Sequence, residues 1–238
     1  MTRSPLLLLL AAALTLSAGC ARTETVPAAS ASTTAAASGD VKPAAAAGMS
    51  GLTDSVSAAA DRGRIRGSAD APVWFIEVSD FQCPFCKQWH DASFAKIDSE
   101  YVKTGKVRMA YLNFPLSIHA NARAAAEAAM CASVQDKFWQ MHESLFATQP
   151  RWEDQPNPLP TFDSLAVAAG VDAKAWRDCM STHATAKIID ADHDRSRSAG
   201  VGSTPTFFIG DRKLEGAYPT DSFRVAIDTA LAAAAAKH

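Results

Sequence analysis

Aromatic residues are missing from the first 73 residues of this 238-residue chain, because all 11 Phe, 5 Trp and 3 Tyr lie between Trp74 and Phe223. Large side chains supply most of the apolar area that a hydrophobic core buries. Their absence excludes a second folded domain at the N-terminal end. The sequence therefore predicts a single domain preceded by a long N-terminal extension.

An excess of charge of one sign is also missing. The chain has 23 Lys and Arg against 25 Asp and Glu, a formal net charge of −2 and a pI near 6.3. Domains that bind nucleic acid carry a basic excess that neutralises phosphates. The balance therefore gives no support to a nucleic-acid partner.

Long hydrophobic runs are limited to one segment near the N-terminus. Residues 6–16 are apolar and follow Arg3, which is the pattern of a signal peptide, whereas a membrane-spanning helix needs about 20 apolar residues. We therefore predict that residues 1–19 are a signal peptide and that the protein is exported.

The predicted signal peptide ends in Leu16-Ser17-Ala18-Gly19-Cys20, which resembles the lipobox of bacterial lipoproteins. In those proteins the cysteine is lipidated and becomes the new N-terminus. Ser17 stands where the motif more often has Leu, and the alternative is an ordinary cleaved signal peptide that contains a cysteine. The resemblance implies that Cys20 anchors the protein to a membrane on its periplasmic side.

Residues 20–60 are rich in Ala, Ser, Thr and Pro and contain no aromatic residue. Such a segment buries too little apolar area to offset the entropy lost on ordering it. We expect a disordered linker here, with the folded domain at residues 61–238.

The folded part alternates between strand and helix patterns. Residues 73–78 form a short β-branched and aromatic run typical of a buried strand, a helical pattern covers residues 84–103, and residues 107–114 predict a second strand. Helical segments then fill residues 118–198, followed by a hairpin around Gly210 and a helix over residues 219–236. This order predicts an α/β fold with a helical insertion in the middle of the sheet domain.

Two of the remaining cysteines form the motif Cys83-Pro84-Phe85-Cys86 between the first strand and the first helix. A thiol at a helix N-terminus faces unpaired backbone N–H groups and the positive end of the helix dipole. Both favour the thiolate, which is the attacking and leaving species in disulfide exchange. The motif therefore predicts a redox-active pair that needs no metal and no organic cofactor.

Two other interpretations of this motif are open. A zinc site needs about four ligands, and the sequence has no second C-x-x-C, although His90 and His119 could be recruited. The other alternative is a purely structural disulfide across the short loop.

Two longer segments resemble the DsbA-like thioredoxin-fold family. Residues 75–86, FIEVSDFQCPFC, resemble its active-site segment, and residues 202–209, GSTPTFFI, resemble its cis-proline segment. Residues 125–146 resemble its helical insertion. The similarity covers residues 64–236 in the right order and implies a thioredoxin-like fold.

The resemblance implies a role for each matching residue. Cys83 would be the exposed nucleophile and Cys86 the buried resolving thiol. Glu77, six residues before Cys83, would be a buried acid that serves proton transfer to Cys86, the alternative being a surface residue of the strand. Thr204 and a cis Pro205 would bind an extended substrate strand beside the motif.

Cys131 and Cys179 both fall in the predicted insertion. Some members of the family carry a second disulfide there, and an oxidising compartment favours a bond. The alternative is two buried reduced thiols, because free cysteine packs as a small hydrophobic residue. We expect a structural disulfide.

The activity that the resemblance implies is thiol–disulfide exchange with exported, cysteine-containing proteins, after which a membrane redox partner resets the motif. A threonine before the proline, as at Thr204, resembles the reductase and isomerase branches of the family more than the oxidase branch, which has an aliphatic residue there. The dimeric isomerases, however, need an N-terminal dimerisation domain, which residues 21–60 are too poor in large apolar groups to form. We therefore favour a monomeric oxidase, with a reductase, an isomerase or a non-enzymatic peptide-binding chaperone as alternatives.

Overall fold

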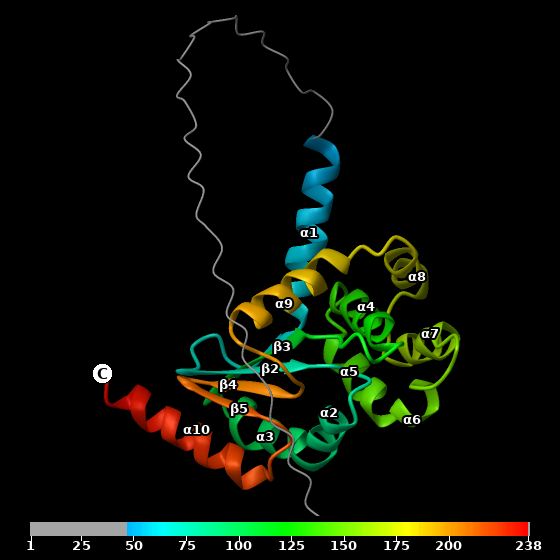
Figure 1. Ribbon diagram of the computed structural model, residues 1–238. Helices are drawn as coiled ribbons and strands as arrows, with labels where there is room; N and C mark the ends of the chain where they lie inside the picture. The colour runs from blue at the N-terminus through cyan, green and yellow to red at the C-terminus, as the bar shows by residue number, and fades with distance from the viewer. Residues whose placement is uncertain (1–46, 238) are drawn as a thin grey trace, which may run out of the picture. The chain divides into compact units, whose positions relative to one another are not determined.

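A five-stranded mixed sheet lies at the centre of the computed structural model, which describes residues 47–237 (Figure 1). Its strand order is β1-β3-β2-β4-β5, with β2 and β3 parallel and the other neighbours antiparallel. The strands are β1 (Ile65–Arg66), β2 (Val73–Ser79), β3 (Val107–Asn113), β4 (Thr206–Ile209) and β5 (Arg212–Glu215). The sheet confirms the predicted α/β class and adds β1, which is too short to leave a periodic signal.

A continuous helical segment carries the chain from β2 to its parallel neighbour β3, as such a connection requires. It consists of α2 (Pro84–Trp89), the π-helical turn η1 (His90–Phe94), α3 (Ala95–Ile97) and a second π-helical turn η2 (Asp98–Val102). Trp89, Phe94 and Ile97 are buried in the core beside the sheet. The span matches the single helix predicted for residues 84–103.

The insertion between β3 and β4 consists of helices, as predicted. They are α4 (Ala122–Ser133), α5 (Phe138–Ala147), α6 (Gln149–Trp152), α7 (Leu159–Ala168), α8 (Ala173–Ser181) and α9 (Ala186–Ser198). Helix α6 is a single turn with a proline in its first two positions, where a missing N–H costs nothing. The core of the insertion is continuous with the redox motif, since Phe81, Cys83 and Cys86 belong to the same cluster of buried residues as Phe138 and Phe146.

Two further cores lie on the faces of the sheet. Helix α10 (Thr220–Ala235) packs on one face, where the ring of Phe223 contacts those of Phe75 and Phe207. Alternate residues of a strand point to opposite faces, and Val78 accordingly belongs to a separate small cluster. The sheet is therefore covered on both sides around the end of β2, where the redox motif begins.

Helix α1 (Ala47–Gly63) corrects the expected boundary of the linker. Ala60 is fully buried, and the Ser133 hydroxyl donates to its backbone carbonyl at 2.6 Å. Gly63 lies so close to the Ser133 carbonyl that a Cβ at this position would overlap it. The composition predicted that this stretch buries too little apolar area to be ordered. Its small residues instead allow α1 to approach α4 closely.

The predicted signal peptide, Cys20 and the first part of the linker lie outside the described residues. Within residues 47–237, no helix combines the length and the apolar character needed to cross a bilayer.

Candidate redox site

The C-x-x-C motif lies where β2 gives way to α2. Cys83 is the N-cap residue of α2, with extended backbone angles of φ −69° and ψ 124°, and Pro84 occupies the first turn. The carbonyl of Cys83 accepts the N–H of Lys87 at 3.1 Å, which begins the helical hydrogen-bond pattern. The first backbone N–H groups of α2 are therefore free to face the Cys83 sulfur.

Both thiols are free; Cys86 is buried as expected, whereas Cys83 is more buried than expected. Cys86 is 0% exposed and Cys83 is 3% exposed, so the expectation of an exposed nucleophile is wrong for this structure. The backbone of Thr204 covers the sulfur of Cys83, with its carbonyl oxygen 3.4 Å away. The neighbouring Phe85 is 60% exposed and marks the open side of the motif.

The environment shifts the pKa values of the two thiols in opposite directions. The pKa of Cys83 is lowered to about 6, chiefly by a hydrogen bond from the Cys86 thiol and further by the Thr204 side chain and the backbone N–H groups of Phe85 and Cys86. Burial raises the pKa of Cys86 well above its usual range. At neutral pH, Cys83 is therefore the thiolate and Cys86 the thiol.

The segment before β4 brings Thr204 and Pro205 beside the motif. The peptide bond between them is cis. Antiparallel pairing of β4 with β2, with Thr206 opposite Val78, places this segment next to the end of β2. The sequence-predicted residues Cys83, Cys86, Thr204 and Pro205 thus form one site.

Glu77 lies in the middle of β2, the strand that leads to the motif. It is 0% exposed and neither carboxyl oxygen has a hydrogen-bond partner among the described residues, which excludes the surface alternative. Burial raises its pKa to about 8, partly offset by the Ser79 hydroxyl. The carboxyl group therefore holds a proton at neutral pH.

Sequence reasoning missed a set of amide side chains that fix the loop before α2. The buried amide of Gln149 donates to the carbonyls of Phe81 at 2.6 Å and Cys83 at 3.2 Å. Gln82 accepts the backbone N–H of Asn121 at 2.6 Å. These bonds connect the redox loop to the insertion. No sequence signal could have found them, because isolated amide residues follow no pattern.

A buried carboxylate also holds this loop. Asp80 is 1% exposed and accepts the N–H of Gln82 at 2.8 Å, the N–H of Leu116 at 2.9 Å and Nδ1 of His119 at 2.7 Å. Nδ1 of His90 lies 3.3 Å from Asp91. The two histidines that a metal site could have recruited therefore contact aspartates instead of the motif.

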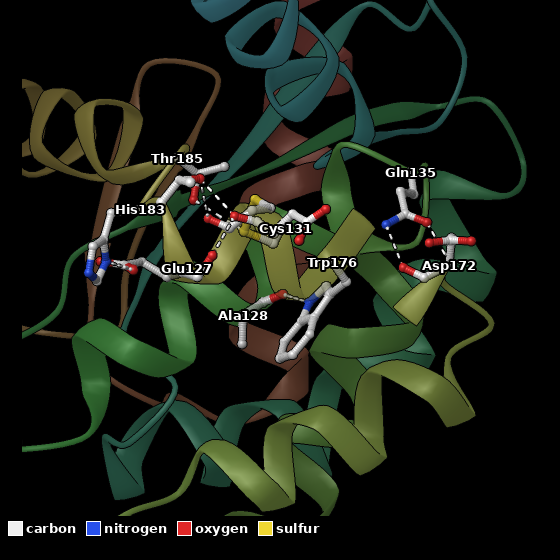
Figure 2. The surroundings of a disulfide bond; sticks show 12 residues. Glu127, Ala128, Cys131, Gln135, Asp172, Trp176, His183 and Thr185 are labelled. Atoms are coloured by element: carbon white, nitrogen blue, oxygen red, sulfur yellow. Dashed lines mark hydrogen bonds and ion pairs between the residues drawn. A yellow bond between two sulfur atoms is a disulfide. The ribbon is translucent and has the colours of Figure 1, made fainter. Parts of the chain in front are cut away.

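Cys131 of α4 and Cys179 of α8 are joined by a disulfide, with an S–S distance of 1.98 Å and a Cα–Cα distance of 5.8 Å. Figure 2 shows its surroundings, in which the Trp176 indole donates to the Ala128 carbonyl at 3.1 Å and so connects the same two helices. The alternative of two reduced thiols does not hold in this structure.

A family model described as Thioredoxin matches residues 59–229. Disulfide bond formation protein D of Bacillus subtilis is 25% identical over 169 residues, which are 70% of this chain and 76% of that protein. Na(+)/H(+) antiporter NhaA 3 of Salinispora tropica is 34% identical over 175 residues, or 73% of this chain. The chain spans only 26% of the length of that antiporter, and the match lies in this part alone.

Solved structures show the same arrangement of elements. Oxidised BdbD from Bacillus subtilis superposes with a TM-score of 0.65 at 26% identity, covering 71% of this chain and 94% of that one. Alpha-DsbA1 of Wolbachia pipientis also gives a TM-score of 0.65, at 23% identity, and covers 73% of this chain and 93% of that one. The second likeness is one of fold alone.

Proposed function

The chain belongs to the DsbA-like thiol-disulfide oxidoreductases of the thioredoxin family, and from this premise we propose that it is a disulfide-forming oxidase for exported proteins. The observation that carries the proposal is the inequality of the two thiols, with the pKa of Cys83 lowered to about 6 and that of Cys86 raised. A stabilised thiolate favours the reduced form of the motif, and a motif whose reduced form is favoured is a strong oxidant.

The proposed reaction begins from the Cys83–Cys86 disulfide. A substrate thiolate attacks the sulfur of Cys83, a substrate–Cys83 disulfide forms, and Cys86 leaves as a thiolate that takes up a proton. A second substrate thiolate then attacks the substrate sulfur of the mixed disulfide, which leaves Cys83 as a thiolate. The substrate gains one disulfide and the motif gains two electrons, so a membrane redox partner must remove those electrons.

Substrate would bind beside Cys83, against exposed Phe85. Thr204 and Pro205 lie beside Cys83 in the bend that leads into β4, and a substrate strand would pair with the backbone there. Exposed Phe85 offers an apolar contact next to the reacting sulfur. The substrate class is therefore an unfolded or extended cysteine-containing chain.

A reductase or isomerase is the second candidate function, and Thr204 before the cis proline favours it. The Thr204 side chain also helps to lower the pKa of Cys83, which is equally consistent with an oxidase. The direction of electron flow separates the two functions.

We also propose the location that the first residues predict. Acylation of Cys20 would hold a monomeric domain on the periplasmic side of a membrane, close to the partner that reoxidises it. Stable attachment requires more than one acyl chain, because a single chain binds only marginally.

The test is the oxidation of a reduced dithiol peptide by the oxidised protein. We expect one peptide disulfide for each motif reduced, and no oxidation by Cys83→Ser or Cys86→Ser. A chaperone would bind the peptide equally well when Cys83 is replaced in Cys83→Ser. Equal binding by this variant, together with no thiol exchange by the wild type, would contradict the proposal.

A further inference from the structure

The helical insertion contains a groove with a volume of about 790 Å³, which is large enough for a short peptide segment. Its walls are α4, the start of α7, and α8. Ala124, Met180 and Trp176 line it, and all three belong to or pack against the buried cluster that contains the redox motif. Leu159, the first residue of α7, also lines the groove and is 47% exposed. The groove therefore presents an apolar surface to solvent.

The two long walls of the groove are fixed to each other. The Cys131–Cys179 disulfide joins α4 to α8, and the Trp176 indole donates to the Ala128 carbonyl at 3.1 Å (Figure 2). A groove that is already formed can bind a ligand without the entropy cost of ordering its walls. The disulfide thus stabilises the shape of this groove.

The charged and titratable side chains that line the groove are paired with one another in the described part of the chain. Arg177 contacts both carboxylate oxygens of Asp163, at 2.5 and 2.8 Å. Glu127 accepts from Arg123 at 3.2 Å and contacts Nδ1 of His183 at 2.6 Å (Figure 2). A charged ligand would compete with these pairs, whereas an uncharged apolar ligand leaves them intact. The charge pattern therefore favours an uncharged apolar occupant.

One end of the groove begins at the redox loop. Ala120 lines the groove, and the next residue, Asn121, donates its backbone N–H to the side chain of Gln82 at 2.6 Å. The amide of Gln82 donates to the carbonyl of Glu153 at 2.7 Å, in the segment that leads to Leu159. Gln82 directly precedes the redox motif. Both the α4 wall and the segment leading into α7 therefore start beside the reacting cysteine.

The groove is short on the scale of an extended chain. Between Asn121, the N-cap residue of α4, and Glu127, which lines the groove, the helix rises about 9 Å. An extended chain covers this length with about three residues. A substrate whose cysteine is held at Cys83 can thus reach the groove with residues a few positions away.

We propose that this groove binds an uncharged apolar segment of the substrate chain, a few residues from the cysteine that reacts with Cys83. The inference rests on the proposed thiol–disulfide activity and specifies its substrate class. Folded proteins bury most of their large apolar side chains, so the groove selects unfolded chains that expose apolar residues near a cysteine. The side chains of this segment would lie against Leu159 and Trp176.

The test compares two reduced dithiol peptides as substrates of the oxidised protein. One carries a few uncharged apolar residues on each side of its cysteines, and the other carries Ser and Gly there. We expect the apolar peptide to have the lower KM with the wild type. Leu159→Asp places an unpaired charge in the groove and should raise this KM about tenfold with little change in kcat, since burying one leucine-sized side chain contributes a factor of this order.

The matched control is Val167→Asp, which adds the same charge to the same helix. Val167 is 51% exposed and does not line the groove, so this variant should behave like the wild type with both peptides. Leu159→Ser removes the apolar side chain without adding a charge and gives the same reading if Leu159→Asp does not fold.

The possible failures are distinguishable. Equal KM values for the two peptides with the wild type, or equal effects of Leu159→Asp and Val167→Asp, would overturn the groove assignment and leave the oxidoreductase activity in place. If the wild type oxidises neither peptide, the proposed function fails, and calorimetry with the apolar peptide carrying serine in place of cysteine tests the groove alone. Binding that Leu159→Asp weakens supports the groove, and no binding overturns it. Self-association that depends on Leu159, with peptide binding unaffected by the variant, would overturn the proposal in favour of a second copy of the chain.

Discussion

The sulfur of Cys83 lies 3.4 Å from the backbone carbonyl oxygen of Thr204, although the two residues are 121 positions apart in the sequence. The contact exists because β4 pairs with β2 in antiparallel register and places the start of β4 beside the end of β2. The whole insertion lies between the two residues along the chain. The redox site is thus assembled from the two ends of the sheet domain.

Replacing Thr204 by Val should raise the pKa of Cys83 above about 6, because the Thr204 side chain helps to lower it. The ultraviolet absorbance of the thiolate against pH measures this directly. Thr206→Val is the control, since the Thr206 hydroxyl donates to the Ser203 carbonyl instead. An unchanged thiolate titration in Thr204→Val would contradict the assignment of this hydroxyl.

Glu77 makes the stability of the reduced protein depend on pH. Its pKa is about 8 in the folded protein against 4.5 for the ordinary group, so the folded state binds the proton more tightly. The stability that this provides is complete below the ordinary pKa and is lost as pH rises through about 8.

The variant Glu77→Gln removes this dependence, because the amide does not titrate. Relative to wild type, it should gain free energy of unfolding as pH rises, on the order of a few kcal/mol at full deprotonation. Denaturant unfolding over a range of pH measures the difference, with Glu143→Gln at an exposed position as control. Parallel pH profiles for wild type and Glu77→Gln would contradict the raised pKa.

Gln149→Ala should destabilise the protein and disturb the redox loop. The variant removes two hydrogen bonds, to the carbonyls of Phe81 and Cys83. The Cys83 carbonyl keeps the N–H of Lys87, and leaving the Phe81 carbonyl without the amide costs roughly 1–3 kcal/mol. Thermal or denaturant unfolding measures the loss, and Gln140→Ala at an exposed position is the control. Equal stability of the two variants would show that the loop does not depend on this amide.

The Cys131–Cys179 bond should stay oxidised while the motif is reduced. Neither cysteine is the N-cap residue of a helix, and Cys131 is buried. The bond closes a separation of 48 residues, and its loss in Cys131→Ala/Cys179→Ala should cost roughly 2–4 kcal/mol. Quantitative thiol trapping during reduction should release the motif's pair of thiols first, and simultaneous release of all four would contradict a structural role.

The sequence predicted those parts of the site that carry a local signal. The C-x-x-C motif has such a signal in its position at a strand-to-helix junction, whereas the Thr204-Pro205 segment was assigned from its resemblance to the family's cis-proline segment. Glu77 was assigned as a buried acid from the resemblance to the family, and the apolar residues on either side of it favour the same placement.

The remaining features arise from tertiary packing and leave no trace in the sequence. Gln149 and Asp80 act on backbone groups, so their role depends on where distant carbonyl and N–H groups come to lie. Helix α1 is ordered by close approach to α4 rather than by large side chains. The burial of Cys83 follows from the Thr204 segment that covers it.

The reduction potential of the Cys83–Cys86 couple tests the central claim most directly. It is measured by equilibrating the protein with glutathione buffers of defined ratio and counting free thiols, with the Cys131–Cys179 pair as an internal reference that stays oxidised. An oxidase with a stabilised Cys83 thiolate should have a potential toward about −120 mV, the value of a strong oxidant. A potential near about −270 mV, which is that of a reductant, would contradict the account.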